Sequence, residues 1–112
     1  MRVSGQTPEE LETLLEDAFV LQDAQAVARL FDDRSVLVTG PGPTQVRGRV
    51  EISRVAPSLW EGKRRYLAEP RLVFQAHDTT LLIGDGVINV VRRGSDGAWR
   101  YVIAVLQVGP TV

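Results

Sequence analysis

The hydrophobic pattern of this 112-residue chain changes its period once, and that change restricts the fold more than any other feature. Up to about residue 60, apolar residues recur every three or four positions, as they do on the buried face of an amphipathic helix. From residue 69 onward they follow in extended runs separated by short polar turns, which is typical of strands. Helices first and strands afterwards predict a single α+β domain over residues 1–112, with three N-terminal helices packed in a curved mixed or antiparallel sheet.

Three segments carry the helical pattern. The first begins at Thr7, where Pro8 suits the first helical position and Glu10 completes a capping box. Its predicted core face holds five apolar residues: Leu11, Leu14, Leu15, Ala18 and Phe19. Glu12 is expected to lie away from that face, with the other acidic side chains of the helix. Asp23 is expected to cap a short second helix, and a third follows Gly48, with Pro57 kinking or ending it.

The extended segments are bounded by glycine, proline and polar turns. We expect strands over residues 35–39 and 71–77, a short strand over 44–46, one long strand over 81–93 and a last strand over 99–108. The last strand is apolar at every position from Val102 to Leu106, which is typical of a strand buried on both faces. The helices can cover only one face in a chain of this length. The sequence therefore predicts a homodimer that packs sheet to sheet.

Composition excludes several kinds of chemistry. The chain has no cysteine and one histidine, so thiolate metal sites, disulfides and sites that need two imidazoles are excluded, and no metal or cofactor is expected. A net charge of −1 predicts no nucleic-acid partner, and no apolar run is long enough to span a membrane. The N-terminus lacks the core of a signal peptide, which favours a cytoplasmic protein. The basic segment 47–65 is interpreted as a solvated surface, with an RNA or transport adaptor as the alternative.

Five residues are candidates for a site. Asp85 and Asn89 fall on one mostly apolar face of the predicted long strand, where a ligand could satisfy them; the alternative is that solvent and backbone do so. His77 is either an exposed turn residue or an acid–base group. Trp60 and Tyr66 flank the basic segment, where they could line the mouth of a pocket, although Trp60 could equally be a core residue.

With this order of elements, the chain resembles the nuclear transport factor 2-like superfamily, in particular its small SnoaL-type and ketosteroid-isomerase-like bacterial members. The resemblance lies in residues 23–33, in Arg47-Gly48-Arg49 and in the final hairpin segment 96–103, and it extends from about Thr7 to Val108. It implies a cone whose sheet encloses a pocket, and a dimer formed through the sheet.

Ketosteroid isomerases use an aspartate base, a tyrosine and a protonated aspartate. The resemblance places Thr39 at the position of the base and Leu15 at that of the tyrosine, and neither can take that role. Asn89 falls near the position of the donor aspartate, where its amide could still bind a carbonyl. The resemblance therefore does not extend to ketosteroid isomerisation by this mechanism, and leaves Thr39 and Asn89 as ligand-binding candidates.

Two functions stay open at this point. The first is a dimeric protein that holds an apolar small molecule, with Asn89, Thr39, Trp60 and Tyr66 as binding residues. Its catalytic form would be an isomerase, cyclase or hydratase acting on a carbonyl-bearing or polyketide-like compound, with Asp85 or His77 as the base. The second is a non-catalytic dimerisation or association module whose cone is filled by its own side chains.

Overall fold

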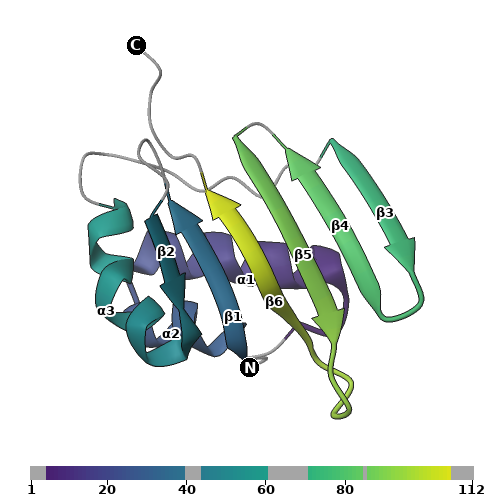
Figure 1. Cartoon of the computed structure of the whole chain (residues 1–112), viewed down its shortest axis with the longest axis horizontal. Coiled ribbons are helices and arrows are strands. Elements are labelled where there is room, and N and C mark those ends of the chain that lie inside the picture. The colour runs from purple at the N-terminus through teal and green to yellow at the C-terminus, as the bar shows by residue number, and fades with distance from the viewer. Residues whose placement is uncertain (1–4, 40–43, 61–70, 85, 107–112) are drawn as a thin grey trace.

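Three helices and six strands make up the part of the chain that the computed structural model describes, which is residues 5–39, 44–60, 71–84 and 86–106 (Figure 1). The helices are α1 (Pro8–Leu21), α2 (Ala24–Arg29) and α3 (Gly48–Trp60). The strands are β1 (Phe31–Thr39), β2 (Thr44–Arg47), β3 (Leu72–Ala76), β4 (Thr79–Gly84), β5 (Val87–Arg93) and β6 (Trp99–Leu106). The predicted α+β class is confirmed, and so is the mixed sheet.

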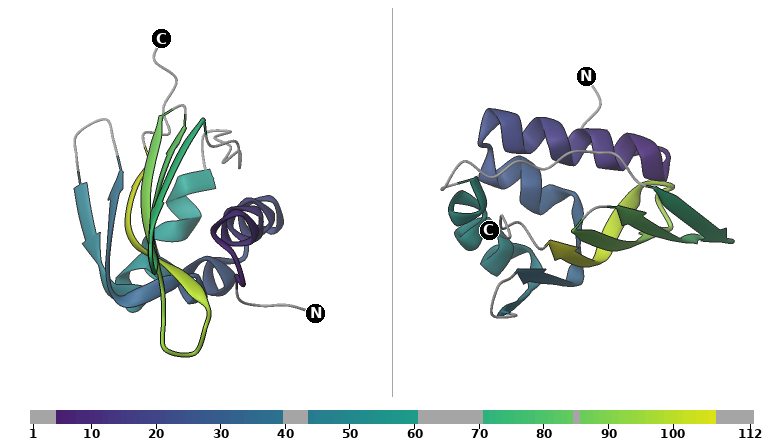
Figure 2. Two further views of the ribbon diagram at one scale, coloured as in Figure 1. Left: turned by 90° about the vertical axis from the view of Figure 1, so that its right-hand side faces the viewer. Right: turned by 90° about the horizontal axis from the view of Figure 1, so that it is seen from above.

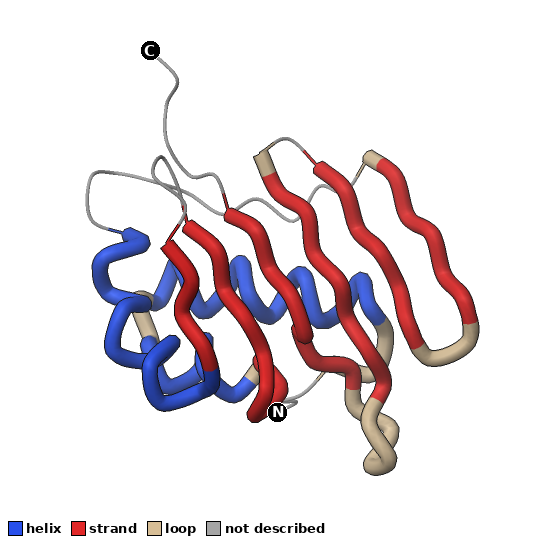
Figure 3. The backbone as a smooth tube through the Cα atoms, in the orientation of Figure 1, coloured by secondary structure: helices blue, strands red, loops and turns tan. Residues whose placement is uncertain are grey.

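The six strands form one sheet in the order β2-β1-β6-β5-β4-β3 (Figure 3). All neighbouring strands are antiparallel except β1 and β6, which are parallel. The helices lie on one side of this curved sheet, and α1 crosses behind β1, β6 and β5 (Figures 1 and 2). We call the side that faces the helices the enclosed face and the opposite side the outer face. The described part of the chain places no helix on the outer face.

The helix starts follow the signals that the sequence carries. Thr7 Oγ1 accepts a hydrogen bond of 3.0 Å from the backbone N–H of Glu10, and Asp23 Oδ1 accepts one of 3.0 Å from that of Ala26. Pro57 does not end α3, which runs on to Trp60. In the described residues, no helix is long and apolar enough to cross a membrane.

One predicted strand is in fact two. Residues 81–93 were expected to be continuous, but β4 ends at Gly84 and β5 begins at Val87, and the two strands pair as an antiparallel hairpin. Gly86 has a φ of 68°, a left-handed conformation that glycine adopts without strain, so the glycines mark the turn. The prediction of one continuous strand over residues 81–93, on which Asp85 and Asn89 would share a face, is therefore wrong; Asp85 itself lies outside the described residues.

The core lies between the helices and the enclosed face. Its fully buried members include Leu11 and Leu15 of α1, Leu37 of β1 and Ile52 of α3. Arg49 ties α3 to the start of β1, because its Nε donates to the Phe31 carbonyl at 2.7 Å and its guanidinium lies 2.9 Å from Asp33. This arginine of the basic segment 47–65 is thus engaged within the chain.

Candidate functional site

Three polar side chains from three different elements meet on the enclosed face of the sheet. They are Glu12 of α1, Asn89 of β5 and Tyr101 of β6, and all three are buried. Glu12 Oε1 accepts a hydrogen bond from Asn89 Nδ2 at 3.2 Å, and Glu12 Oε2 accepts one from Tyr101 Oη at 3.1 Å. We call these residues the Glu12 cluster. It links α1 to the two central strands of the sheet.

Asn89 reaches the cluster because its strand position faces the helices. The pairing register places it in one cross-strand row between Leu82 of β4 and Ala104 of β6. Partners in such a row share a face of the sheet, and both neighbours are buried. The sequence singled out Asn89 because it is a polar residue on a mostly apolar face of its strand. In the structure Asn89 is buried and makes a polar contact there.

Tyr101 reaches the cluster because of a β-bulge. Val90 pairs with Ile103 and Val91 with Tyr101, so β6 contains one extra residue, Val102, opposite this step of β5. The bulge reverses the alternation, so Tyr101 is fully buried on the enclosed face while Ile103 is 41% exposed on the outer face. Strict alternation would have placed both side chains on the same face.

Glu12 was predicted to lie away from the core, and that prediction is wrong. The side chain is 3% exposed, and Glu12 is the one acidic residue that is buried among the described residues. It is adjacent in sequence to Leu11, which is fully buried, so it lies at the edge of the apolar stripe of α1. The two donors that the sheet presents there, Asn89 and Tyr101, draw the carboxyl group inward.

Burial determines the ionisation of this cluster. Desolvation raises the pKa of Glu12 above its ordinary value, although the hydrogen bonds from Asn89 and Tyr101 oppose the rise. Desolvation also raises the pKa of Tyr101 well above 10, and the neighbouring Glu12 charge adds to this effect. The phenol is therefore neutral at physiological pH and acts as a hydrogen-bond donor.

A further polar group lies near the cluster without a hydrogen-bond partner. The hydroxyl of Thr80 on β4 is fully buried, and among the described residues it has no partner. Thr80 pairs with Val91, and it is two residues from Leu82, the partner of Asn89. It therefore faces the helices one strand away from Asn89.

The structure does not bring together those predicted site residues that it describes. His77 is exposed in the turn between β3 and β4, with a φ of 54°, and the neighbouring Asp78 pairs with Arg93. Thr39 is partly buried at the end of β1, two strands away from the strand of Asn89. Trp60 packs edge-on against Phe19 of α1, with ring centroids 5.7 Å apart.

Two of the predicted site residues, Asp85 and Tyr66, lie outside the described residues. The described chain also contains no group of three potential ligands, among His, Cys, Asp and Glu, that could hold a metal ion.

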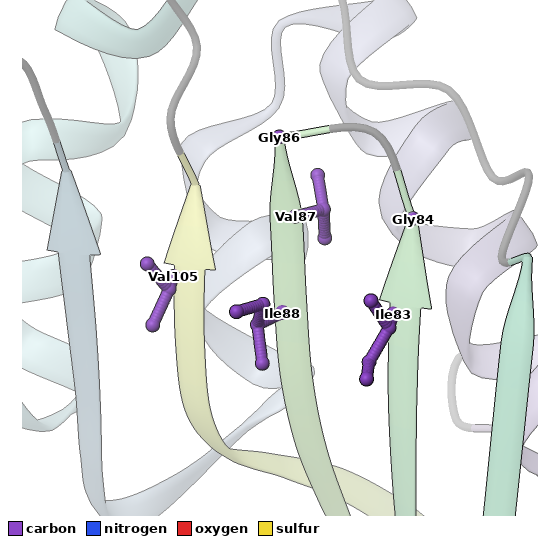
Figure 4. A pocket seen from close by; sticks show the side chains of 6 residues that line it. All are labelled: Ile83, Gly84, Gly86, Val87, Ile88 and Val105. Carbon is purple, nitrogen blue, oxygen red and sulfur yellow. The ribbon is translucent and has the colours of Figure 1, made fainter.

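The outer face is apolar over most of its width. Two cross-strand rows cover it from β3 to β1, and they contain only aliphatic and aromatic residues: Leu72, Ile83, Ile88, Val105 and Val38 in one, and Phe74, Leu81, Val90, Ile103 and Val36 in the other. Four of the ten are more than 40% exposed: Leu72, Phe74, Ile88 and Ile103. A hollow of about 190 Å³ opens on this face near the turn between β4 and β5 (Figure 4).

Comparison with solved structures identifies the architecture. A protein from Thiobacillus denitrificans, proposed to be a calcium/calmodulin-dependent protein kinase type II association domain, superimposes with a TM-score of 0.75 at 21% identity, over 97% of this chain and 99% of that chain. A protein from Novosphingobium aromaticivorans, nuclear transport factor 2-like with a cystatin-like fold, gives a TM-score of 0.68 at 16% identity, over 93% and 80%. The chain has the nuclear transport factor 2-like fold.

A ketosteroid isomerase-like protein from Erwinia carotovora shares this fold, with a TM-score of 0.70 at 20% identity over 86% of this chain and 88% of that chain. No protein-family model and no curated protein sequence matches the chain. The nuclear transport factor 2-like resemblance that the sequence suggested is thus confirmed at the level of fold. At these identities the likeness does not assign an activity.

Proposed function

We propose that this chain is a self-associating module, in which two copies form a homodimer through the outer faces of their sheets. The observation that carries this proposal is the pair of apolar rows on the outer face, with Leu72, Phe74, Ile88 and Ile103 each more than 40% exposed. Monomeric proteins rarely leave so continuous an apolar surface in water. A second copy of the chain presents the same surface, so a twofold contact covers both.

Face-to-face packing of the two sheets removes this apolar surface from water, which is the dominant favourable term in most protein associations. A stable interface of standard size buries about 800 Å² on each partner. Two sheets that pack face to face interdigitate their side chains in this way within a single protein. The Thiobacillus protein is described as an association domain, and we extend that role to this chain as part of the proposal.

A charge on the outer face tests the proposal. Ile103→Lys places an ammonium group at the predicted contact, where an unpaired buried charge should raise the dissociation constant of the dimer roughly 100-fold or more. The matched control is Val20→Lys, because Val20 is a 76% exposed apolar residue of α1, a helix on the other side of the sheet. Sedimentation velocity should show a monomer for Ile103→Lys and a dimer for Val20→Lys. Equal behaviour of the two variants would contradict the proposed interface.

The second candidate is a small-molecule-binding protein, and the Glu12 cluster favours it. Carboxyl, amide and phenol groups converge on the enclosed face, and the Thr80 hydroxyl lies there without a partner among the described residues. Such convergent polar groups in an apolar surrounding are typical of ligand sites. The ligand would be an apolar molecule with one oxygen function, carbonyl-bearing or polyketide-like.

The catalytic form of this candidate would be an isomerase, cyclase or hydratase. Glu12 takes the role of the base in it, because its pKa is raised and it is the buried carboxylate of the described chain. The exposed turn position of His77 gives it no comparable environment, and Asp85, the other base that the sequence predicted, lies outside the described residues.

A pair of matched probes tests the second candidate. Naphthalene and 2-naphthol differ by one hydroxyl group, so a site built on the Glu12 cluster should bind 2-naphthol more tightly. Asn89→Leu should remove that preference. Wild-type affinity that is the same for both probes, or absent for both, would rule out this site and leave the association module alone.

A further inference from the structure

The hollow on the outer face has an apolar lining. It is lined by Ile83, Ile88 and Val105 of the outer face and by the two glycines of the β4–β5 turn region, Gly84 and Gly86 (Figure 4). Val87, which packs against the core, completes the lining at its edge. Neither glycine contributes a side chain, so the face is open at this point and not filled. Among the described residues, the lining offers no side-chain hydrogen-bonding group, which favours an apolar occupant.

The hollow has the size of an aromatic ring. Its volume is about 190 Å³. A dry engineered cavity of about 150 Å³ with a comparable aliphatic lining accepts benzene. A phenyl side chain that enters from a neighbouring molecule would therefore fit, and would bury its ring against isoleucine and valine.

The same face carries one such ring. Phe74 is 56% exposed. The other large hydrophobic side chains that are exposed in the described part of the chain are all aliphatic. It lies on β3 in the row of Leu81, whereas the hollow begins one row further along β4, at Ile83. Phe74 does not line the hollow of its own chain.

We infer that the Phe74 ring of each copy occupies the hollow of the other copy, an inference that rests on the proposed self-association. A twofold contact brings residue i of one copy to residue j of the other, and j to i. A knob and a hollow on one face therefore meet twice in each dimer. Aromatic anchors in desolvated pockets carry most of the affinity of many interfaces.

The occupant is a second copy because the surroundings of the hollow match the surroundings of Phe74. From β3 to β6 the two outer rows contain eight apolar side chains and no charged or polar one. Any partner that covers the hollow must cover this strip as well, and the chain itself presents an equal strip around Phe74.

Cysteine cross-linking tests the pairing, since the wild-type chain has no cysteine. Phe74→Cys and Ile88→Cys are made as separate chains and then co-expressed. The backbones of two packed sheets lie about 10 Å apart, so positions 74 and 88 should come within reach of a short bis-maleimide that joins two thiols across the dimer. This reagent should give the mixed 74–88 cross-link as the main product. Each variant alone should give little, because the twofold axis passes between the two positions. Val20→Cys with Phe74→Cys is the control, and it should remain uncoupled.

The outcomes separate this inference from the proposed function. A wild-type monomer would overturn both. A wild-type dimer in which the mixed 74–88 cross-link does not form, or in which Phe74→Cys couples mainly with itself, would overturn the placement of Phe74 in the hollow but leave self-association standing. Benzene that shifts the methyl NMR signals of Ile83 and Ile88 in the intact dimer would also overturn it, because the hollow would then be free.

Discussion

Tyr101 Oη donates a hydrogen bond of 3.1 Å to Glu12 Oε2, and this contact joins the last strand to the first helix across 89 positions of the sequence. Both side chains are buried, so the bond forms in a surrounding where water cannot replace it. Asn89 completes the arrangement from the neighbouring strand, with 3.2 Å between its Nδ2 and Glu12 Oε1. The position of α1 on the sheet thus depends on a polar contact as well as on apolar packing.

Glu12→Gln should change how stability depends on pH. Burial raises the pKa of Glu12 in the folded chain above the ordinary value of 4.5, so the folded state holds this proton more tightly than the unfolded state. The resulting stability is fully present below pH 4.5 and is lost as the pH rises through the folded-state pKa. Urea unfolding from pH 4 to pH 8 should show wild type losing stability relative to Glu12→Gln as the pH rises. Parallel profiles would contradict the raised pKa.

Tyr101→Phe should destabilise the fold by about 1–3 kcal/mol, because it leaves a buried carboxylate oxygen without its donor. The ring stays, so the contact with Phe31, whose ring centroid is 5.1 Å away, is kept. Loss of the donor also raises the pKa of Glu12 further, and the destabilisation should therefore increase from pH 4 to pH 8.

The phenylalanine variant has a control within the same cluster. In the Glu12→Gln background the pH dependence of the Tyr101→Phe effect should disappear, because the titrating group is gone. A pH dependence that persists there would show that it comes from another residue.

A single cysteine on the outer face should report the dimer directly. Ile103→Cys replaces a 41% exposed side chain, which a maleimide would reach readily in a monomer. In the proposed dimer the labelling rate should fall about tenfold or more relative to Val20→Cys, and it should recover on dilution below the dissociation constant. Labelling of both variants at the same rate at every concentration would show that the outer face is uncovered.

The fold was largely predictable because each helix and most strands carry a local signal. The Thr7 and Asp23 caps bond as expected, and the change of period separates helices from the meander. The hairpin between β4 and β5 was missed because the alternation over residues 81–93 fits one long strand. Gly84 and Gly86 are compatible both with a bend within one strand and with a turn between two strands. The antiparallel pairing of β4 with β5 shows that they belong to a turn.

The Glu12 cluster was only partly predictable. Asn89 stood out because it interrupts an apolar face, and it is buried there. Glu12 gave no such signal, because a glutamate beside Leu11 at the edge of a helix stripe normally faces water. Tyr101 faces the helices only because of the bulge at Val102, a feature of strand pairing that alternation in one strand cannot show.

The molar mass of the wild-type chain in solution shows directly whether two copies associate. Light scattering over a dilution series should give twice the 12.4 kDa chain mass at micromolar concentration and above, with a decline toward 12.4 kDa only on further dilution. Ile103→Lys should stay at the mass of a single chain over the same range. A wild-type mass of 12.4 kDa at every concentration would contradict the account, because the apolar outer face would then have no second copy against it.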